Sequence, residues 1–386
     1  MSSRPNFRFQ TSNPRWGARI ALFTLILLAW GAPGEYKAQC TPLAGRVPGG
    51  QAVVPLGFSP QSYAVQQRWE KRYLEIPGAA RCRKYLRRLT RRPLVAGTAG
   101  DRHITQFIYD EFRRAGLNPE IIEYRVLLSY PKEVALELVT PKRVPLANPE
   151  PEIPGDKDTG VSDPLMRLPW CAYSPSADLT RPVVYVNYGN AEDYDQLEKL
   201  GVSVKGKMVL ARYFHGYRGG KALEAERRGA AAIIVFSDPA DDGQAKGKTY
   251  PDGPWGPLGH FQRGSVVYDF LTPGDPLTPG WASTDSAPRI PQEEAKILPK
   301  IPMVPLSAAD AQEILERLAG PEVPKSWQGG LPFTYRIGDD SVKVHLALQM
   351  ENRVVPIWNV MARIPGSEEP EKLLILSNHH DAWVYG

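Results

Sequence analysis

Residues 206–236, GKMVLARYFHGYRGGKALEAERRGAAAIIVF, contain the pattern that decides the fold. Residues 207–212 (KMVLAR) and 230–236 (AAAIIVF) are short apolar runs with the length and composition of buried strands. Between them, residues 220–228 predict a helix that ends at Gly229. Strand, helix and strand at this spacing indicate a small α/β module.

Capping and turn residues predict two more helices around this module. Asp101 is a candidate N-cap for a helix that Gly116 follows, and Ser307 begins a capping box with Asp310 for a helix that Gly320 closes. Further strands are predicted at residues 121–128, 183–187, 342–350, 356–364 and 372–378. The last of these, KLLILSN, is almost purely apolar, as in a strand buried on both faces. Proline-rich and glycine-rich stretches predict irregular connections at residues 141–169 and 237–300.

The N-terminus has the pattern of a targeting segment. Four arginines (Arg4, Arg8, Arg15 and Arg19) precede an apolar run at residues 20–32, IALFTLILLAWGA. This run is shorter than the roughly 20 residues that cross a bilayer comfortably, and the pattern is typical of a signal peptide. We therefore predict export, with an uncleaved membrane anchor as the alternative.

Cysteine content and charge exclude some classes of protein. Three cysteines (Cys40, Cys82 and Cys171) cannot form a disulfide framework, although Cys82 and Cys171 could pair. Cys82 also shares an apolar helical face with Tyr85, Leu86 and Leu89, which favours a buried thiol. The basic stretch at residues 81–92 is either a membrane or polyanion patch or, as its helical spacing favours, a solvated helix face. A net charge of +5 is too small to indicate a nucleic-acid partner.

His379 and Asp381 follow the predicted strand at residues 372–378. Ligands in open α/β sheets gather beyond the carboxyl ends of the strands. A neutral imidazole is a good zinc ligand, and a nearby carboxylate can fix its tautomer. The pattern is therefore a candidate metal site, although a His-x-Asp after a strand is more often an ordinary loop.

Several long stretches resemble the glutamate carboxypeptidase and transferrin-receptor family over nearly all of residues 61–386. They are PLVAGTAGD, RVLLSYP, VVYVNYGNAEDY, GKMVLARYFHGYRGGK, SDPADD, YPDGP, QRG, GDPLTPG and NHHDAWVYG. The resemblance implies an α/β fold in which an incomplete mixed-sheet zinc-peptidase domain is interrupted by a protease-associated (PA) domain. The implied order is a signal peptide or anchor at 1–40, a linker at 41–60, the first part of the peptidase domain at 61–127, the PA insert at 128–340, and a truncated second part at 341–386.

The resemblance also implies roles for individual residues. His379 matches the first zinc ligand of the family, and Asp381 the carboxylate that orients it. Arg218 matches the arginine that binds the substrate's C-terminal carboxylate, with Tyr217 as an aromatic neighbour. Ser265 stands where glutamate-specific members have an asparagine, which leaves the side-chain preference of the substrate open. Thr278 and Trp281 match backbone ligands of a structural calcium.

The activity implied for the complete protein is hydrolysis of small peptides with a free C-terminus, with two zinc ions about 3.5–4 Å apart. We expect the chain alone, with one zinc ligand, to be inactive and to be the N-terminal portion of a secreted, periplasmic or membrane-anchored enzyme. The family is often dimeric, which implies a homodimer of the full-length protein. The alternative is a non-enzymatic, transferrin receptor-like binding protein, but that branch has glutamine at the position of His379.

Overall fold

The computed structural model describes residues 54–91, 94–153 and 167–382. The predicted signal segment at 1–40, most of the predicted linker, part of the connection at 141–169 and the residues after Ala382 lie outside the described residues.

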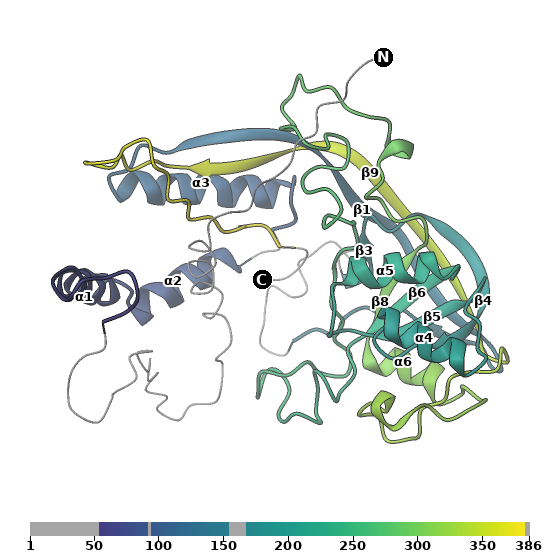
Figure 1. Cartoon of the computed structure of the whole chain (residues 1–386). Coiled ribbons are helices and arrows are strands. Elements are labelled where there is room, and N and C mark those ends of the chain that lie inside the picture. The colour runs from purple at the N-terminus through teal and green to yellow at the C-terminus, as the bar shows by residue number, and fades with distance from the viewer. Residues whose placement is uncertain (1–53, 92–93, 154–166, 383–386) are drawn as a thin grey trace, which may run out of the picture. The chain divides into compact units, whose positions relative to one another are not determined.

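The helices and strands follow one another in a mixed α/β order (Figure 1). The α-helices are α1 (Pro60–Glu75), α2 (Ala79–Leu89), α3 (Ala99–Arg114), α4 (Ala191–Lys199), α5 (Arg218–Arg227) and α6 (Ala308–Leu315). The strands are β1 (Glu120–Thr140), β2 (Val144–Leu146), β3 (Cys171–Ala172), β4 (Ala177–Tyr185), β5 (Met208–Arg212), β6 (Ala232–Phe236), β7 (Gly264–Ser265), β8 (Met303–Leu306) and β9 (Lys343–Met361). Two short 3₁₀ helices, η2 (Gln292–Glu294) and η3 (Lys325–Trp327), complete the described elements.

Seven strands form one mixed sheet in the order β2-β1-β9-β4-β5-β6-β8. The strands from β4 to β8 are parallel neighbours, whereas β9 runs antiparallel to both β1 and β4. A separate parallel pair joins β3 to β7. The mixed sheet confirms the predicted α/β fold class.

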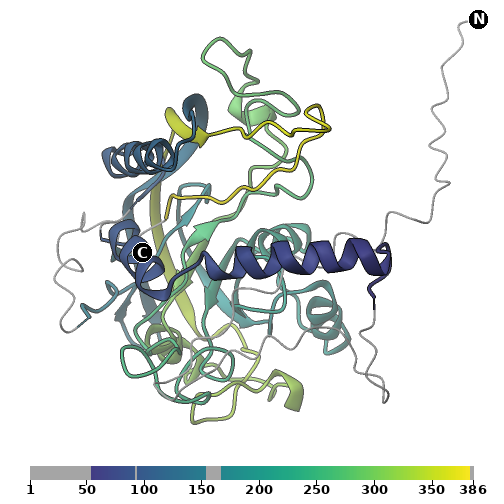
Figure 2. The same cartoon turned by 90° about the vertical axis from the view of Figure 1, so that its left-hand side faces the viewer.

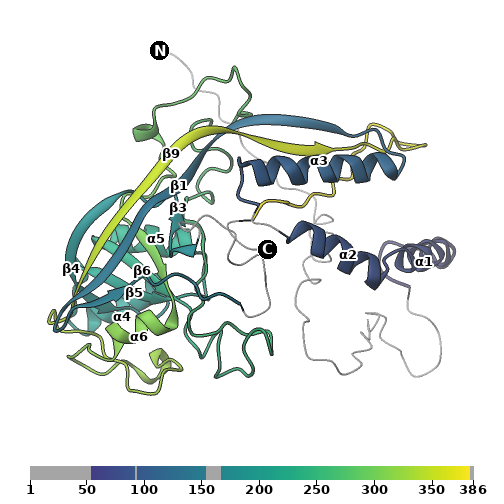
Figure 3. The ribbon, with the colours of Figure 1, turned by 180° about the vertical axis from the view of Figure 1, so that it is seen from behind.

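Strands β1 and β9 pair along almost their whole length, from Glu120 opposite Met361 to Thr140 opposite Lys343 (Figures 1 and 3). The sequence predicted that the first strand ends before Pro131, and this was wrong. The register shifts between Pro131 and Glu133, so a β-bulge accommodates the proline, which has no N–H to donate. The predicted boundary between residues 127 and 128 lies inside β1 and stays a prediction.

The predicted strands at 342–350 and 356–364 are one continuous strand, β9. Pro356 does not interrupt it, because β4 pairs only with the first part of β9, up to Leu348. Beyond that point β1 is the partner strand of β9 among the described residues, and no described strand pairs with the other edge of β9. A proline whose nitrogen faces this unpaired edge removes no hydrogen bond from the ladder. Helix α3 lies along this second half of β9 (Figure 3). The Arg102 guanidinium stacks there over the Trp358 ring.

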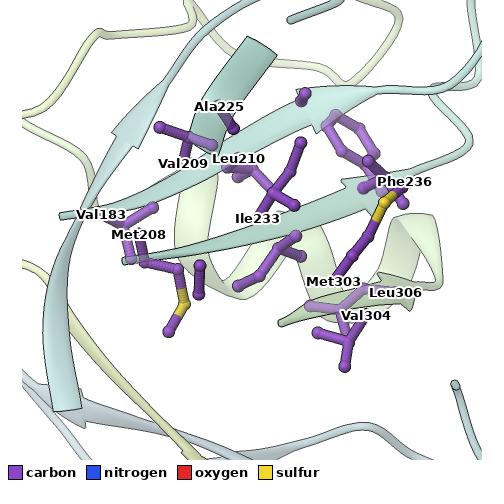
Figure 4. Close-up of a cluster of buried hydrophobic side chains, with 14 of the residues drawn as sticks. Val183, Met208, Val209, Leu210, Ala225, Ile233, Phe236, Met303, Val304 and Leu306 are labelled. Carbon is purple, nitrogen blue, oxygen red and sulfur yellow. The ribbon is translucent and has the colours of Figure 1, made fainter. Parts of the chain in front are cut away.

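The parallel half of the sheet contains the main core. Every residue of β5, β6 and β8 is buried, and Ala225 of α5 belongs to the same cluster of buried apolar side chains (Figure 4). The predicted strand–helix–strand unit is therefore confirmed as β5, α5 and β6. The Ser307 N-cap of α6 is also confirmed, because the Ser307 hydroxyl accepts a hydrogen bond from the Asp310 amide at 3.0 Å. The predicted capping box is not formed, since the Asp310 carboxylate accepts from Asn148 instead.

The prediction of a buried strand at residues 372–378 was wrong. These residues form no helix or strand (Figure 2). The residues from Leu373 to Leu376 are 66–91% exposed. Among the described residues no strand pairs with this segment, and a strand needs a partner for its backbone groups.

Two local predictions near the N-terminus were also wrong. The N-cap of α3 is Thr98, and Asp101 stands in the first turn, where its carboxylate accepts a hydrogen bond from the Gly97 amide at 2.9 Å. Cys82 lies on α2 as predicted, but its thiol is exposed because α2 buries none of its residues against the described part of the chain. Among the described residues, no helix has both the length and the apolar character required to cross a membrane.

Candidate functional site

Arg218 lies at the carboxyl-terminal edge of the parallel sheet. Strand β5 ends at Arg212, a loop of residues 213–217 follows, and Arg218 is the first residue of α5 with Tyr217 as its N-cap. This edge is where open α/β sheets place their ligands. The local pattern of an apolar strand and a glycine-rich turn before a helix therefore puts the predicted arginine at a plausible binding position.

The guanidinium of Arg218 packs against the backbone of β7. A Cβ atom added to Gly264 would lie only 2.0–2.3 Å from three guanidinium atoms, so any side chain at residue 264 would displace the arginine. The Nε atom of Arg218 is buried and has no hydrogen-bond partner among the described residues. Those residues also provide no ion pair for the guanidinium, although it lies 5.7 Å from the Tyr217 ring centroid. A buried cationic donor without an acceptor suits an anionic ligand.

Tyr217 and Ser265, the two other predicted substrate-binding residues, lie beside Arg218. The Tyr217 hydroxyl donates to the carbonyl of Ser265 at 3.2 Å, and Ser265 follows Gly264 in β7. The Ser265 hydroxyl accepts a hydrogen bond from the Val267 amide at 3.2 Å. The structure thus brings the three residues together, although their roles as substrate contacts stay predictions.

Two buried groups next to Arg218 were not predicted from the sequence. Cys171 of β3 pairs with Gly264, and burial raises the pKa of its thiol to about 12, although the guanidinium of Arg218 lowers it in part. Burial likewise raises the pKa of the Tyr213 hydroxyl, with a further contribution from Cys171. Both groups stay protonated at neutral pH, so the thiol is an inert packing group and no nucleophile. Cys171 is free, which leaves no disulfide to Cys82.

Lys221, three residues after Arg218 in α5, is 1% exposed. Its ammonium donates to the carbonyls of Tyr188 at 2.5 Å and Phe214 at 2.8 Å. Burial lowers its pKa to about 8; the carboxylates of Asp193 and Asp241 raise it, and the guanidinium of Arg212 lowers it further. No motif marked this residue, because a lysine in an amphipathic helix is normally solvated.

The predicted zinc ligand, His379, is 78% exposed and lies beside Asp381 as expected. Its Nδ1 is 2.9 Å from the carbonyl oxygen of Asp381 and 3.4 Å from the carboxylate. A carbonyl can only accept, so Nδ1 carries the proton and, in the neutral imidazole, Nε2 keeps its lone pair. This is the tautomer that a zinc ligand needs, so the donor chemistry of His379 fits zinc.

His380 has a partner that the sequence did not reveal. Its Nε2 donates to the carboxylate of Asp101 at 3.0 Å and lies 3.4 Å from the hydroxyl of Thr105. A backbone hydrogen bond also links this segment to the residues before α3, from the Ala382 amide to the Leu94 carbonyl at 2.9 Å. The residues around His379 are therefore docked on the first turn of α3 and on the segment before it. A contact across 279 residues of sequence leaves no local signal.

The described residues contain no group of three or more His, Cys, Asp or Glu side chains that would hold a metal ion. Thr278 and Trp281, the predicted calcium ligands, lie in a turn in which the Trp281 amide donates to the Thr278 carbonyl at 3.3 Å. The nearby carboxylate of Asp275 accepts from the Leu127 amide at 2.6 Å. The structure thus leaves the calcium site a prediction.

Comparison with known proteins identifies part of the chain directly. Residues 179–267, from β4 through β7, match the PA domain family. This match includes Tyr217, Arg218 and Ser265, so the candidate site lies in the PA domain.

Longer relatives match most of the chain. A "Glutamate carboxypeptidase 2 homolog" from Caenorhabditis briggsae is 37% identical over 79% of this chain and 41% of its own length. A "Probable glutamate carboxypeptidase VP8" from Zea mays is 36% identical over 81% of this chain and 41% of its own length. The chain belongs to the glutamate carboxypeptidase-like family. The chain is also similar to an "Aminopeptidase NAALADL1" from Rattus norvegicus, 32% identical over 80% of this chain and 43% of that protein's length.

The chain spans less than half the length of the curated relatives that it matches. Among solved structures, a peptidase M28 precursor from Shewanella amazonensis superposes with a TM-score of 0.41 and 16% identity, over 76% of this chain and 52% of the other.

Proposed function

We propose that the full-length protein is an exported zinc metallopeptidase of the carboxypeptidase type, which removes C-terminal residues from small peptides. The observation that carries this proposal is the guanidinium of Arg218, whose buried Nε has no hydrogen-bond partner among the described residues. Arginine binds carboxylates through two parallel hydrogen bonds, a geometry that a lysine cannot reproduce. The names of the relatives, several of them glutamate carboxypeptidases, support the same class of reaction.

The role of the PA domain in this proposal is positioning. Arg218 would hold the terminal carboxylate of the peptide, and the Tyr217 ring, 39% exposed, would cover one side of the terminal residue. The hydroxyl of Ser265 already accepts a bond from the Val267 amide, so we assign no preference for glutamate to this residue. Binding then depends on the terminal carboxylate rather than on the terminal side chain.

His379 would be the first zinc ligand, through Nε2, with Asp381 holding Nδ1. Bound zinc supplies polarisation of the scissile carbonyl and activation of a water molecule. The contribution of this chain is to hold the imidazole in one tautomer, because the carbonyl of Asp381 accepts from Nδ1.

The Arg218→Ala substitution tests the carboxylate-binding role in the full-length protein. Losing one charge-assisted contact should cost about 1.5–3 kcal/mol, or roughly 10- to 150-fold in kcat/KM, for peptides with a free C-terminus. Matched peptides with an amidated C-terminus lack the charge and should be affected little. Equal losses on both peptides would mean that Arg218 supports the loop, and a preference for a free N-terminus would favour an aminopeptidase.

Zinc dependence has a separate test. The full-length protein should lose activity on dialysis against a chelator and regain it with added zinc, and His379→Ala should lower zinc affinity in a competition with a chromophoric chelator by about 10-fold or more. The matched control is His345→Ala, because His345 lies in β9 and pairs with Asp178 at 2.9 Å. A full-length protein that binds no zinc would favour the receptor-like alternative.

Export is proposed from the sequence of residues 1–40 alone. A fusion of residues 1–45 to a reporter that is active only outside the cytoplasm should be active, and replacing Leu25, Leu27 and Leu28 with lysine should abolish this activity. A normally expressed but inactive fusion would contradict the proposal.

A further inference from the structure

The loop that leads into Arg218 has an unusual backbone. Phe214 and His215 both have positive φ angles, of 70° and 46°, and Gly216 follows with a φ of 145°. Side chains with a Cβ rarely adopt the left-handed region, and two in succession persist only when the surroundings impose it. Residues 213–217, here called the Arg218 loop, are therefore held in place by something other than their own preference.

Two side chains hold the Arg218 loop by donating hydrogen bonds to the carbonyls of Phe214 and His215. The ammonium of Lys221 donates to the carbonyl of Phe214 at 2.8 Å, and the side-chain amide of Asn190 donates to the carbonyl of His215 at 2.7 Å. The Tyr188 ring also packs on the His215 ring, with centroids 4.4 Å apart. Each residue in the left-handed region thus has its own side-chain donor.

Lys221 also ties this loop to its neighbour in the sheet. Its ammonium donates to the carbonyl of Tyr188, in the loop that follows β4, as well as to the loop that follows β5. Lys221 belongs to α5 itself, and its amide donates to the carbonyl of Tyr217 at 3.1 Å. One side chain therefore fixes the entry to α5 relative to the ends of two parallel strands, immediately before Arg218.

Arg218 has little freedom to tolerate a movement of this loop. Its guanidinium already packs on Gly264 so closely that a single added Cβ would overlap it. A shift of the first turn of α5 by a fraction of an ångström would therefore move the guanidinium off β7 or turn its Nε away.

We infer that Lys221 and Asn190 are positioning residues for Arg218, which set the direction of its guanidinium by holding the Arg218 loop in its left-handed conformation. The inference rests on the proposed function of Arg218 as the group that binds a terminal carboxylate. It adds that this recognition depends on the loop between β4 and α4, the loop after β5 and the first turn of α5. Neither residue needs to touch the substrate.

Two substitutions in the full-length protein test the inference. Lys221→Met removes the donors and keeps an unbranched side chain, and Asn190→Asp removes the donor to His215 but keeps an oxygen that can cap α4. Each should raise KM for a peptide with a free C-terminus by about 10-fold relative to its effect on the matched amidated peptide, with a smaller change in kcat. Tyr335→Phe is the matched control, since it removes a buried hydrogen bond to Asp238, the second residue after β6, and leaves the donors of Lys221 and Asn190 in place.

A role in positioning predicts coupling to Arg218. In an Arg218→Ala background, neither Lys221→Met nor Asn190→Asp should change the ratio of KM values for free and amidated peptides any further. The inference is overturned if Arg218→Ala changes this ratio and the two loop variants do not, or if Tyr335→Phe changes it as much as they do. If Arg218→Ala itself leaves the ratio unchanged, the proposed function fails instead. Asn190→Asp keeps the test decisive if the Lys221→Met protein does not fold.

Discussion

The pairing of β1 with β9 is the constraint on which the rest of the structure depends. The side chain of Thr140 bonds to Lys343, 203 residues later, so this pairing closes a very long loop. Closing a loop of this length costs conformational entropy, and nineteen residue pairs offset it, with Leu136, Leu138, Val344 and Leu346 buried in the half next to β4. The PA domain lies within the closed loop, and β4 joins it to β9 through six residue pairs.

The parallel strands beyond β4 carry the candidate binding site at their carboxyl ends. Because β5 and β6 are buried on both faces, their polar groups concentrate at their carboxyl ends. Three basic side chains lie at this edge and differ in their partners. Arg212 bonds to Asn187 at 2.7 Å, and Lys221 bonds to two carbonyls, whereas Arg218 has no acceptor among the described residues. The Nε of Arg212 is also buried without a partner, but its other nitrogens contact Asn187 and Asp241, so among the described residues Arg218 is the one of these three cations whose charge is left for an anion.

The sequence predicted the local elements well and the distant contacts poorly. The strands β5 and β6, helix α5 and the Ser307 cap of α6 each follow from a few neighbouring residues, so periodicity and capping were sufficient. The fusion of two predicted strands into β9 depends on β1, and the bond from His380 to Asp101 depends on α3, which no local pattern encodes. The apolar run at 372–378 resembled a buried strand because composition reports the preference of a segment and not whether a partner strand is present. The clustering of Tyr217, Arg218 and Ser265 was expected only through family resemblance, since β7 is two residues long and gives no periodic signal.

The central claim is that Arg218 presents a free donor to a terminal carboxylate, and the most direct measurement observes that donor. The Nε–H resonance of Arg218, assigned by comparison with Arg218→Lys, can be followed by heteronuclear NMR while a peptide is added to the protein. A peptide with a free C-terminus should shift this resonance downfield and slow its exchange with water, because a charge-assisted hydrogen bond forms at Nε. The amidated peptide should leave it unchanged. A resonance that responds equally to both peptides, or to neither, would contradict the account.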